Sequence, residues 1–529
     1  MDPVFDYVIV GAGSAGCVLA ARLSEDPRVR VALLESGPSD NSVLIHCPAG
    51  LAVLGRRGTH TDALETVPQA GLNGRRGHQP RGRTLGGSSS VNAMIYIRGH
   101  PDDYDRWVRM GATGWGWDDV LPWFIRGEGN ERLGEPLHGR DGPLNVADLR
   151  DPNPFSHLFV QAGEQAGHVR NDDFNGPAQE GVGLYQVTQR DGERCSAARA
   201  YLSPALQRSN LQVFTGVTAD RILFDGRRAC GVHALRGGQP LTIGARSEVL
   251  LCAGALQSPA VLMRSGIGPG EHLQAHGIEV LAHRPQVGAN LHDHPDVVLV
   301  AEATDAYELF GRSPRGAVHI LRDIWQWRQH RRGRLTTNFA EAGGFLRAFP
   351  TSTQPDVQLH FVVAMLIDHG RRQVAGHGFS THVCALQPFS RGSVRLADAS
   401  PESPPAIDPG FLADERDLAV LMAGVRRARE ILSQPALASR GREWARSREH
   451  RSDEALGQWI RDNADTIYHP VGSCRMGVDE AAVVDPSLRV RGVDGLRVVD
   501  ASVMPCIVSG NTNAPTLMIA ERAVAMIAA

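Results

Sequence analysis

A short glycine motif close to the N-terminus limits what this chain can fold into. The motif GAGSAG occupies residues 11–16, follows the apolar run 7–10 and opens into the helix-like segment 17–23. In a strand–turn–helix unit, the first glycine permits a tight turn, the second lets the backbone approach a pyrophosphate, and the third lets the helix pack on the strand. The free N–H groups at the helix N-terminus then face the phosphates. We therefore expect a dinucleotide to contact Gly11, Gly13, Ser14, Ala15 and Gly16.

An acidic residue follows at the spacing that such a unit requires. The second strand-like segment, residues 31–37, contains Glu35 at the position where an acid meets a ribose hydroxyl. A glycine turn in some other βαβ unit is the alternative. The length of 529 residues exceeds what one hydrophobic core supports, so we expect two large lobes or interleaved domains.

The charge of the chain excludes several classes of function. A net charge of −3 and a pI near 6.7 give no reason to expect nucleic acid as a partner. The sequence contains no lysine, so all 55 basic residues are arginine. A phosphate-binding lysine of the Walker type and a lysine Schiff base with pyridoxal phosphate are therefore excluded.

Cysteine spacing and hydropathy indicate the cellular compartment in which the protein works. The 8 cysteines are scattered without the spacing of zinc ligands, as is typical of thiols in a reducing cytoplasm. We find no basic segment followed by an apolar run at the start, and no apolar stretch of roughly 18–20 residues. We expect a cytoplasmic protein without a transmembrane segment, with peripheral association at the inner membrane as the alternative.

The order of the patterns predicts an α/β protein (α+β overall). Strand candidates at 211–217 and 247–255, and a final helix with Pro515 in its first turn, add to the N-terminal unit. We expect a Rossmann-like βαβ domain interleaved with a domain of sheet plus helices. The predicted dinucleotide domain comprises 1–155, 201–304 and 465–529, and the predicted substrate-binding domain comprises 156–200 and 305–464.

Four further blocks resemble one family, the glucose–methanol–choline flavin oxidoreductases. The blocks are GRTLGGSSSVNAMIY at 82–96, GALQSPAVLMRSGIG at 254–268, IYHPVGSCRMG at 467–477, and VVDASVMPCIVSGNTNAPTLMIAE at 498–521. The resemblance covers essentially the whole chain and favours FAD over NAD, since an NAD dehydrogenase has no reason to carry these blocks. It implies that a substrate alcohol loses a hydride to the flavin.

The resemblance also implies where FAD would bind. A second glycine-rich loop would pass its backbone over the pyrophosphate, the residues after it would follow the flavin ring, and three C-terminal residues would lie near the cofactor. Val217 would offer its backbone to the adenine. Val91 stands where some members link FAD through a histidine, so we expect non-covalent FAD. The implied residues are Gly86, Gly87, Ser88, Asn92, Ala93, Met94, Ile95, Val217, Asp500, Ala501 and Thr516.

Alcohol oxidation needs a base for the hydroxyl proton, and histidine suits this role because its ordinary pKa lies near neutral pH. His469 precedes Pro470 and Gly472 in a shaped turn, and by resemblance it is the catalytic histidine. The partner position, 44 residues on, is assigned to Asn513, which would donate a hydrogen bond to the developing alkoxide.

Two other groups of histidines are candidates for lesser roles. The segment His292-Asp293-His294 is too short for a metal site, so we expect structural hydrogen bonding there and no metal in the protein. His360 lies on a strand-like segment, and two interpretations are weighed equally: a hydrogen-bonded core residue, or the histidine that lines the substrate cavity in the family.

The substrate is predicted by resemblance to the bacterial aliphatic-alcohol dehydrogenases. We expect a primary alcohol to be oxidised to the aldehyde, with a quinone, another carrier or O₂ as electron acceptor. Choline dehydrogenase is the main alternative and would need a cage for the quaternary ammonium, for which Trp325 and Glu341 are candidates. An alcohol oxidase, a hydroxynitrile lyase and a flavoprotein without catalytic activity are further alternatives.

Overall fold

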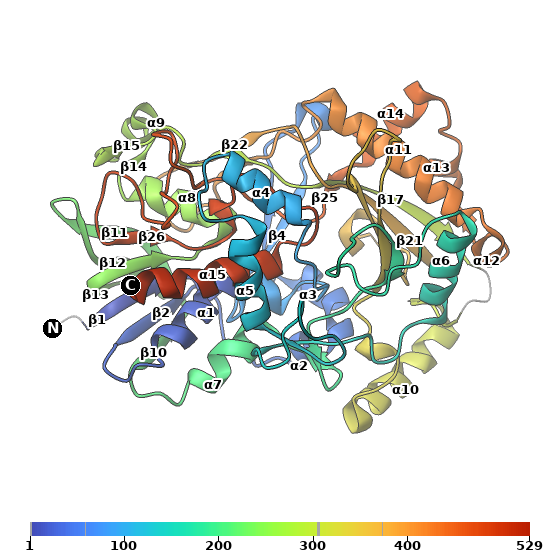
Figure 1. Ribbon diagram of the computed structural model, residues 1–529, viewed down its shortest axis with the longest axis horizontal. Coiled ribbons are helices and arrows are strands. Elements are labelled where there is room, and N and C mark those ends of the chain that lie inside the picture. The colour runs from blue at the N-terminus through green and yellow to red at the C-terminus, as the bar shows by residue number, and fades with distance from the viewer. Residues whose placement is uncertain (1–2, 59, 304–306, 373, 529) are drawn as a thin grey trace.

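The structure is a computed structural model that describes residues 3–58, 60–303, 307–372 and 374–528. Two large sheets lie toward opposite ends of an elongated molecule, and helices cover both (Figure 1). Each sheet has its own hydrophobic core, with Val249 and Leu33 in one and Val383 and Leu421 in the other. This arrangement confirms the predicted α/β fold with a Rossmann-like part.

The first sheet is built around the N-terminal βαβ unit. Its strands follow the order β10-β2-β1-β13-β12-β11, and β26 pairs with β13. The β10, β2, β1 and β26 strands run parallel to their neighbours, whereas β11, β12 and the first half of β13 form an antiparallel meander. The bounds are β1 Val4–Val10, β2 Val31–Glu35, β10 Leu211–Thr215, β11 Val217–Asp225, β12 Arg228–Arg236, β13 Gln239–Leu251 and β26 Leu496–Val498.

Helices from both ends of the sequence pack together on this sheet. Helix α1 (Ser14–Leu23) connects β1 to β2 and packs against α15 (Asn513–Ala528), which in turn contacts α5 (Trp117–Gly127) (Figure 1). Helix α8 (Gly254–Arg264) follows β13 directly. The chain therefore begins and ends in the same lobe, and the N-termini of α1 and α15 come close together.

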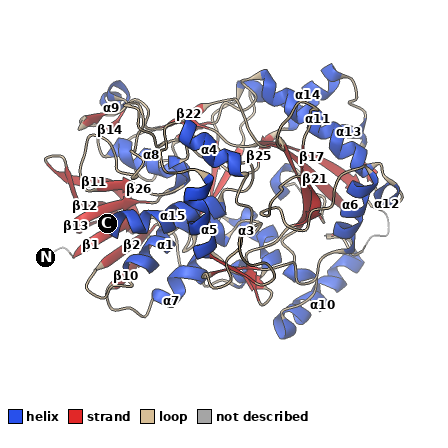
Figure 2. Ribbon diagram, in the orientation of Figure 1, coloured by secondary structure: helices blue, strands red, loops and turns tan. Residues whose placement is uncertain are grey.

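The second sheet is antiparallel and is formed mainly by the middle of the chain. Its strands follow the order β24-β17-β21-β20-β19-β7, with β18 beside β21 and β25 beside β17. Helices α6, α11, α13 and α14 lie on the outer side of this sheet (Figure 2). The strands are β7 Gly181–Leu184, β17 Pro295–Glu302, β18 Gly311–Arg312, β19 Ala340–Leu346, β20 Val357–Val362, β21 Gly376–Ala385, β24 Arg442–Glu443 and β25 Asp465–Thr466. The longer helices of this lobe are α6 Pro154–Gln165, α10 Pro314–His330, α11 Glu415–Leu432 and α14 Asp453–Asn463, and the short helix α13 spans Ala445–Arg448.

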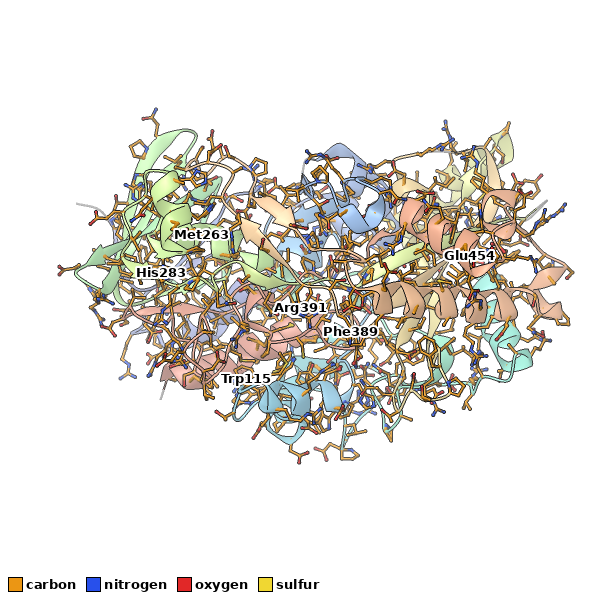
Figure 3. The ribbon with its side chains drawn as sticks, turned by 90° about the horizontal axis from the view of Figure 1, so that it is seen from above. Trp115, Met263, His283, Phe389, Arg391 and Glu454 are labelled. Atoms are coloured by element: carbon orange, nitrogen blue, oxygen red, sulfur yellow. The ribbon has the colours of Figure 1, made fainter. Side chains whose placement is uncertain are left out.

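Short elements connect the two lobes. A three-stranded sheet joins β16 (Ala289–Leu291), β22 (Gly392–Arg395) and β23 (Ala406–Asp408), and a hairpin joins β3 (Thr61–Glu65) to β4 (His78–Gly82). Seen from above, Met263 and His283 lie toward one end of the molecule and Glu454 toward the other, with Phe389 and Arg391 between them (Figure 3). Helix α4 (Pro101–Arg109) lies in this middle region as well (Figure 1).

The sheets do not follow the predicted domain boundaries. Strands β17 and β25 pair with each other in the second sheet, although residues 295–302 and 465–466 were expected in the dinucleotide domain. Conversely, β22 and β23 pair with β16 rather than with the second sheet. The apolar pattern of β17 shows that it is a strand but carries no information about its partner strands. The boundary expected between residues 304 and 305 lies outside the described residues.

The described part of the chain contains no helix that is both long enough and apolar enough to cross a membrane. Seven of the eight cysteines are buried, Cys230 is exposed, and all eight are free thiols.

Candidate active site

One large cavity, of about 1150 Å³, extends between the two sheets. Its lining includes the carboxyl ends of β1 and β2 and the start of β11 from the first sheet, and parts of β20 and β21 from the second. It thus reaches from the N-terminal βαβ unit of the first lobe into the second lobe.

The first glycine loop has the geometry that the motif predicts. A Cβ on Gly16 would lie 1.9 Å from the carbonyl oxygen of Gly11, and a Cβ on Gly11 would lie 2.5 Å from that of Cys252. Gly11 also has φ of +100°, which a side chain would strain. Gly13 lines the cavity and a Cβ there would meet nothing within 4 Å, so the backbone is open to a ligand.

Glu35 lies at the end of β2, beside this loop. Its carboxylate accepts hydrogen bonds from the backbone N–H of Ala12, at 3.0 Å, and of Gly37, at 2.8 Å. Burial raises the pKa of the Glu35 carboxyl to about 7. Since the side chain also lines the cavity, it is placed to meet the hydroxyls of a ribose.

The second glycine loop lies directly on the first. A Cβ on Gly87 would lie 2.7 Å from the Cα of Gly13, and the N–H of Gly86 donates to the carbonyl of Ala12 at 2.7 Å. Both glycines have positive φ, +85° at Gly86 and +53° at Gly87. Only backbone separates the two loops, so a pyrophosphate can approach both of them.

A buried arginine that the sequence analysis missed holds the segment after this loop. Arg194 donates to the backbone carbonyls of Ser89 and Asn92, at 3.2 and 2.7 Å, and to the side-chain oxygen of Asn92 at 2.9 Å. Asn92 in turn accepts from the N–H of Met94, whose φ is +60°. Nothing in the local sequence marks Arg194, because its role depends on contacts between distant segments.

The structure brings the predicted cofactor residues together. All of them line the cavity except Gly16 and Gly86, which support the loops from behind. Val91 lines the cavity as well. Asp500 accepts from the N–H of Gly254, at 2.9 Å, and from the hydroxyl of Ser258, which fixes the N-terminus of α8 at the cavity.

His469 also lines the cavity, where its imidazole is held on two sides. Its Nδ1 lies 3.2 Å from Nδ1 of His294, whose Nε2 donates to the carbonyl of Leu386 at 2.9 Å. Because that Nε2 carries the proton of His294, its Nδ1 is an acceptor and His469 carries its own proton on Nδ1. The lone pair of His469 is therefore on Nε2.

The hydrogen-bond partner of that Nε2 is Asn511. The amide Nδ2 of Asn511 lies 3.2 Å from Nε2 of His469, and its Oδ1 accepts from Nε2 of Gln358 at 3.2 Å, which fixes the orientation of the amide. Asn513, which the sequence predicts as the donor to the alkoxide, does not contact His469 here: it is the first residue of α15 and its Oδ1 accepts from the hydroxyl of Ser14 at 2.7 Å. Its role toward the substrate stays a prediction.

Asn513 has a different place in the cavity. Its hydrogen bond to Ser14 joins the N-termini of α15 and α1, and Asn513, Ser14 and Thr516 all line the cavity. Two helix N-termini thus present free N–H groups and positive dipole ends to one region. This is the cofactor end of the site, beside the glycine loops.

Burial keeps the histidines of the site neutral. It lowers the pKa of His469 well below the ordinary value, assisted by the neighbouring His294 and His360. The same cause lowers the pKa of His294 to about 4 and that of His360 to about 3. A neutral His469 with its lone pair on Nε2 can accept a proton from a hydroxyl.

The remaining predicted candidates divide between the cavity and the core. His360 lines the cavity, and neither ring nitrogen has a hydrogen-bond partner among the described residues, which favours the cavity interpretation. The structural role expected for residues 292–294 is confirmed: Asp293 accepts from the N–H of His469 at 2.8 Å, and His292 accepts from that of Ile507 at 2.9 Å.

The proposed cage residues do not line the cavity. Trp325 is 60% exposed on α10. Glu341 is buried, where its carboxylate accepts from the N–H of Asn153, at 2.6 Å, and from the hydroxyl of Ser156, at 2.7 Å. No lone carboxylate is thus left for a quaternary ammonium at this position.

Comparisons with known proteins agree with this geometry. The sequence profiles of the GMC oxidoreductase family match residues 5–296 and 388–520. The chain is 47% identical to an alcohol dehydrogenase [acceptor] of Pseudomonas putida, over 99% of this chain and 96% of the relative. It is 43% identical to the mitochondrial choline dehydrogenase of Homo sapiens, over 98% and 89%.

A solved structure extends the similarity to the fold. The crystal structure of pyridoxine 4-oxidase from Mesorbium loti matches with a TM-score of 0.88 and 35% identity, over 98% of each chain. The two stacked glycine loops, the acid at the end of β2 and the long cavity fit an extended dinucleotide, as the family requires. The chain therefore belongs to the GMC oxidoreductase family, and it is an oxidoreductase whose cofactor is FAD.

Proposed function

We propose that this protein oxidises a primary aliphatic alcohol to the aldehyde, with His469 as the base. The observation that carries the proposal is the pair formed by the Nε2 lone pair of His469 and the amide of Asn511 at the wall of the cavity. A hydroxyl that enters between them meets an acceptor for its proton and a donor for its oxygen.

The chain's own residues perform the proton chemistry. Nε2 of His469 takes the hydroxyl proton, while Nδ2 of Asn511 donates to the oxygen as negative charge develops there. His294 fixes the tautomer through Nδ1, and Gln358 fixes the amide of Asn511. Bound FAD supplies the acceptor for the hydride that leaves the alcohol carbon.

The lining of the cavity favours an uncharged alkyl substrate over choline. It includes Phe310, Phe339 and Met365, and six arginines line the cavity as a whole, among them Arg312, Arg334 and Arg372. A quaternary ammonium would be repelled by these cations, whereas each buried methylene of an alkyl chain adds about 0.8 kcal/mol. The similarity to choline dehydrogenase keeps choline as the alternative to test.

We also infer the electron acceptor, the compartment and the role of each lobe. The electrons pass from FAD to a quinone or another carrier, with O₂ as the alternative acceptor. The protein works in the cytoplasm or on the inner face of the membrane. The first lobe serves as the FAD-binding domain and the second as the substrate-binding domain, with boundaries that follow the sheets.

The test is anaerobic mixing of the holoenzyme with 1-alkanols of increasing length and with choline, followed by the loss of flavin absorbance. Medium-length alkanols should reduce the flavin faster than choline at equal concentration. His469→Gln should retain FAD and slow reduction by roughly 10²–10⁴, the usual scale for loss of a general base.

His377→Gln is the matched control, because this histidine is buried on β21, is hydrogen-bonded through both ring nitrogens and does not line the cavity. It should leave the rate unchanged. Faster reduction by choline would reverse the substrate assignment, and no reduction by any alcohol would leave a flavoprotein without this activity, such as a lyase. Admitting air afterwards distinguishes an oxidase, which reoxidises at once, from a dehydrogenase.

A further inference from the structure

A second histidine, His369, lies in a loop of the second lobe. It contacts the turn at residues 467–472 that carries His469, which we call the catalytic turn. It lies in the short 3₁₀ segment Asp368–Gly370, in the connection between β20 and β21, and it lines the cavity together with Tyr468 and His469. Its Nδ1 lies within hydrogen-bond distance of the Tyr468 hydroxyl, and its Nε2 lies 2.7 Å from Oδ2 of Asp465. Three side chains thus form a continuous chain, Asp465–His369–Tyr468, that ends one residue before the base.

The direction of each hydrogen bond follows from the groups involved. The Asp465 carboxylate can only accept, so His369 donates from Nε2 and accepts the Tyr468 hydroxyl proton at Nδ1. Hydrogen bonding to His369 also lowers the pKa of Asp465, although burial opposes this effect. The carboxylate is held by backbone as well, since it accepts from the N–H of His78 at 3.1 Å and from that of Thr466 at 2.8 Å.

Tyr468, at the end of this series of hydrogen bonds, has a strained backbone. Tyr468 has φ of +75°, a left-handed conformation that strains a residue with a side chain. Neighbouring contacts must fix such a residue, and three do so: Thr466 Oγ1 accepts from its N–H at 2.6 Å, Arg81 donates to its carbonyl at 3.1 Å, and His369 binds its hydroxyl. Because the next peptide unit is that of His469, this conformation sets the direction in which the imidazole projects.

We propose that His369 is a positioning residue for the base: through the Tyr468 hydroxyl it holds the turn that aims Nε2 of His469 at the substrate hydroxyl. The inference rests on the proposed function of His469. It assigns a role in the reaction to a loop of the second lobe, which contacts the turn that follows β25. Asp368 and His369 both have positive φ, +48° and +54°, so the loop is itself held in this conformation by the contacts of His369.

The test uses three variants of the holoenzyme, His369→Ala, Tyr468→Phe and the double variant, with the limiting rate of anaerobic flavin reduction by an alkanol as the first readout. A misaimed base lowers this rate by about 10-fold or more and leaves the apparent Kd for the alcohol nearly unchanged. If His369 acts through Tyr468, the double variant is no slower than the slower single variant.

His369→Gln is the conservative variant, because its amide oxygen can accept from Tyr468 while its nitrogen donates to Asp465. It should recover most of the rate. His377→Ala, which removes a buried histidine outside the cavity, should lower Tm without lowering the rate. Additive losses in the double variant, no loss in His369→Ala, or an equal loss in His377→Ala would overturn the proposal.

A second readout separates this proposal from the proposed function. In spectra of ¹⁵N-histidine-labelled holoenzyme, the signal of His469 is identified by its disappearance in His469→Gln. It should move in His369→Ala and in Tyr468→Phe and stay in place in His377→Ala. A moved signal in an enzyme that no alcohol reduces would support the positioning contact and contradict the function, whereas an unmoved signal would overturn the contact.

Discussion

Two asparagines with one residue between them have different hydrogen-bond partners in this site. Asn511 comes before the last helix and turns its amide toward Nε2 of His469, whereas Asn513 begins that helix and binds Ser14. The backbone changes from loop to helix between them, and both side chains line the cavity with different partners. These contacts predict that Asn511 acts on the substrate and Asn513 on the cofactor.

Separate substitutions should therefore give separate defects. Asn511→Ala removes a donor to the developing alkoxide, so it should slow flavin reduction by about 10²–10³ while FAD stays bound. Asn513→Ala should leave the rate of the FAD-loaded enzyme near that of the wild type but weaken retention of FAD, because the join between α15 and α1 is lost. Stopped-flow reduction and flavin content after gel filtration measure the two effects. The reverse pattern would assign the donor to the alkoxide to Asn513 and the cofactor contact to Asn511.

His360 gives a prediction about stability and pH. Burial holds the pKa of this imidazole near 3, below its ordinary value of 6.5. In the unfolded chain His360 is protonated as the pH falls through about 6.5, whereas in the folded chain it stays neutral until about pH 3. The free energy of unfolding therefore decreases as the solution is acidified across this window. Between pH 7 and pH 5 the loss from this one group amounts to about 2 kcal/mol.

His360→Gln removes the titrating group while keeping a polar side chain. Its deficit in Tm relative to the wild type should shrink between pH 7 and pH 5, as measured by thermal unfolding of the holoenzyme at both values. His157→Gln is the control, since this histidine is exposed on α6 and meets water in both states. A deficit in His360→Gln that is constant or grows on acidification would show that the imidazole is protonated in the folded protein.

At the scale of elements, apolar periodicity and glycine spacing predicted the helices, strands and turns that depend on local sequence. The βαβ unit, the strand before α8 and the final helix all occur as expected, because each has a start signal and an apolar pattern of its own. The fold class and the residues of both glycine loops were predictable for the same reason. Glycine conformations are imposed locally, and Gly11 and Gly87 have the positive φ that such turns need.

What the sequence could not predict depends on contacts between distant segments. The pairing of β17 with β21, the hold of Arg194 on the loop after Gly87, and the contact of His369 with Tyr468 each join residues far apart in the chain. The tautomer of His469 likewise depends on His294. The resemblance to a family did not imply the contact of His369 with Tyr468 or that of His294 with His469. A sequence pattern identifies the elements, but the partner of each buried polar group is set when the elements pack.

At the scale of the whole molecule, the cavity explains how FAD can be held without a covalent bond. Its lining comes from both lobes, so a dinucleotide inside it would contact the glycine loops at one end and the catalytic turn at the other. The supporting contacts are distributed over two helix N-termini, two loops and Glu35. Release would require many of them to break together, which slows dissociation without making it irreversible.

The last prediction follows from that arrangement and from Val91. Val91 lines the cavity, and its side chain offers no nucleophile to the flavin. By resemblance, it stands where some members of the family are expected to link FAD through a histidine. Acid denaturation followed by centrifugation should therefore leave the yellow colour in the supernatant, for the wild type and for the matched control Val91→Ala alike. Other potential nucleophiles line the same cavity, among them His78 and Tyr468. A yellow pellet would show that one of these is linked, and mass spectrometry of the flavin-bearing peptide would then identify it.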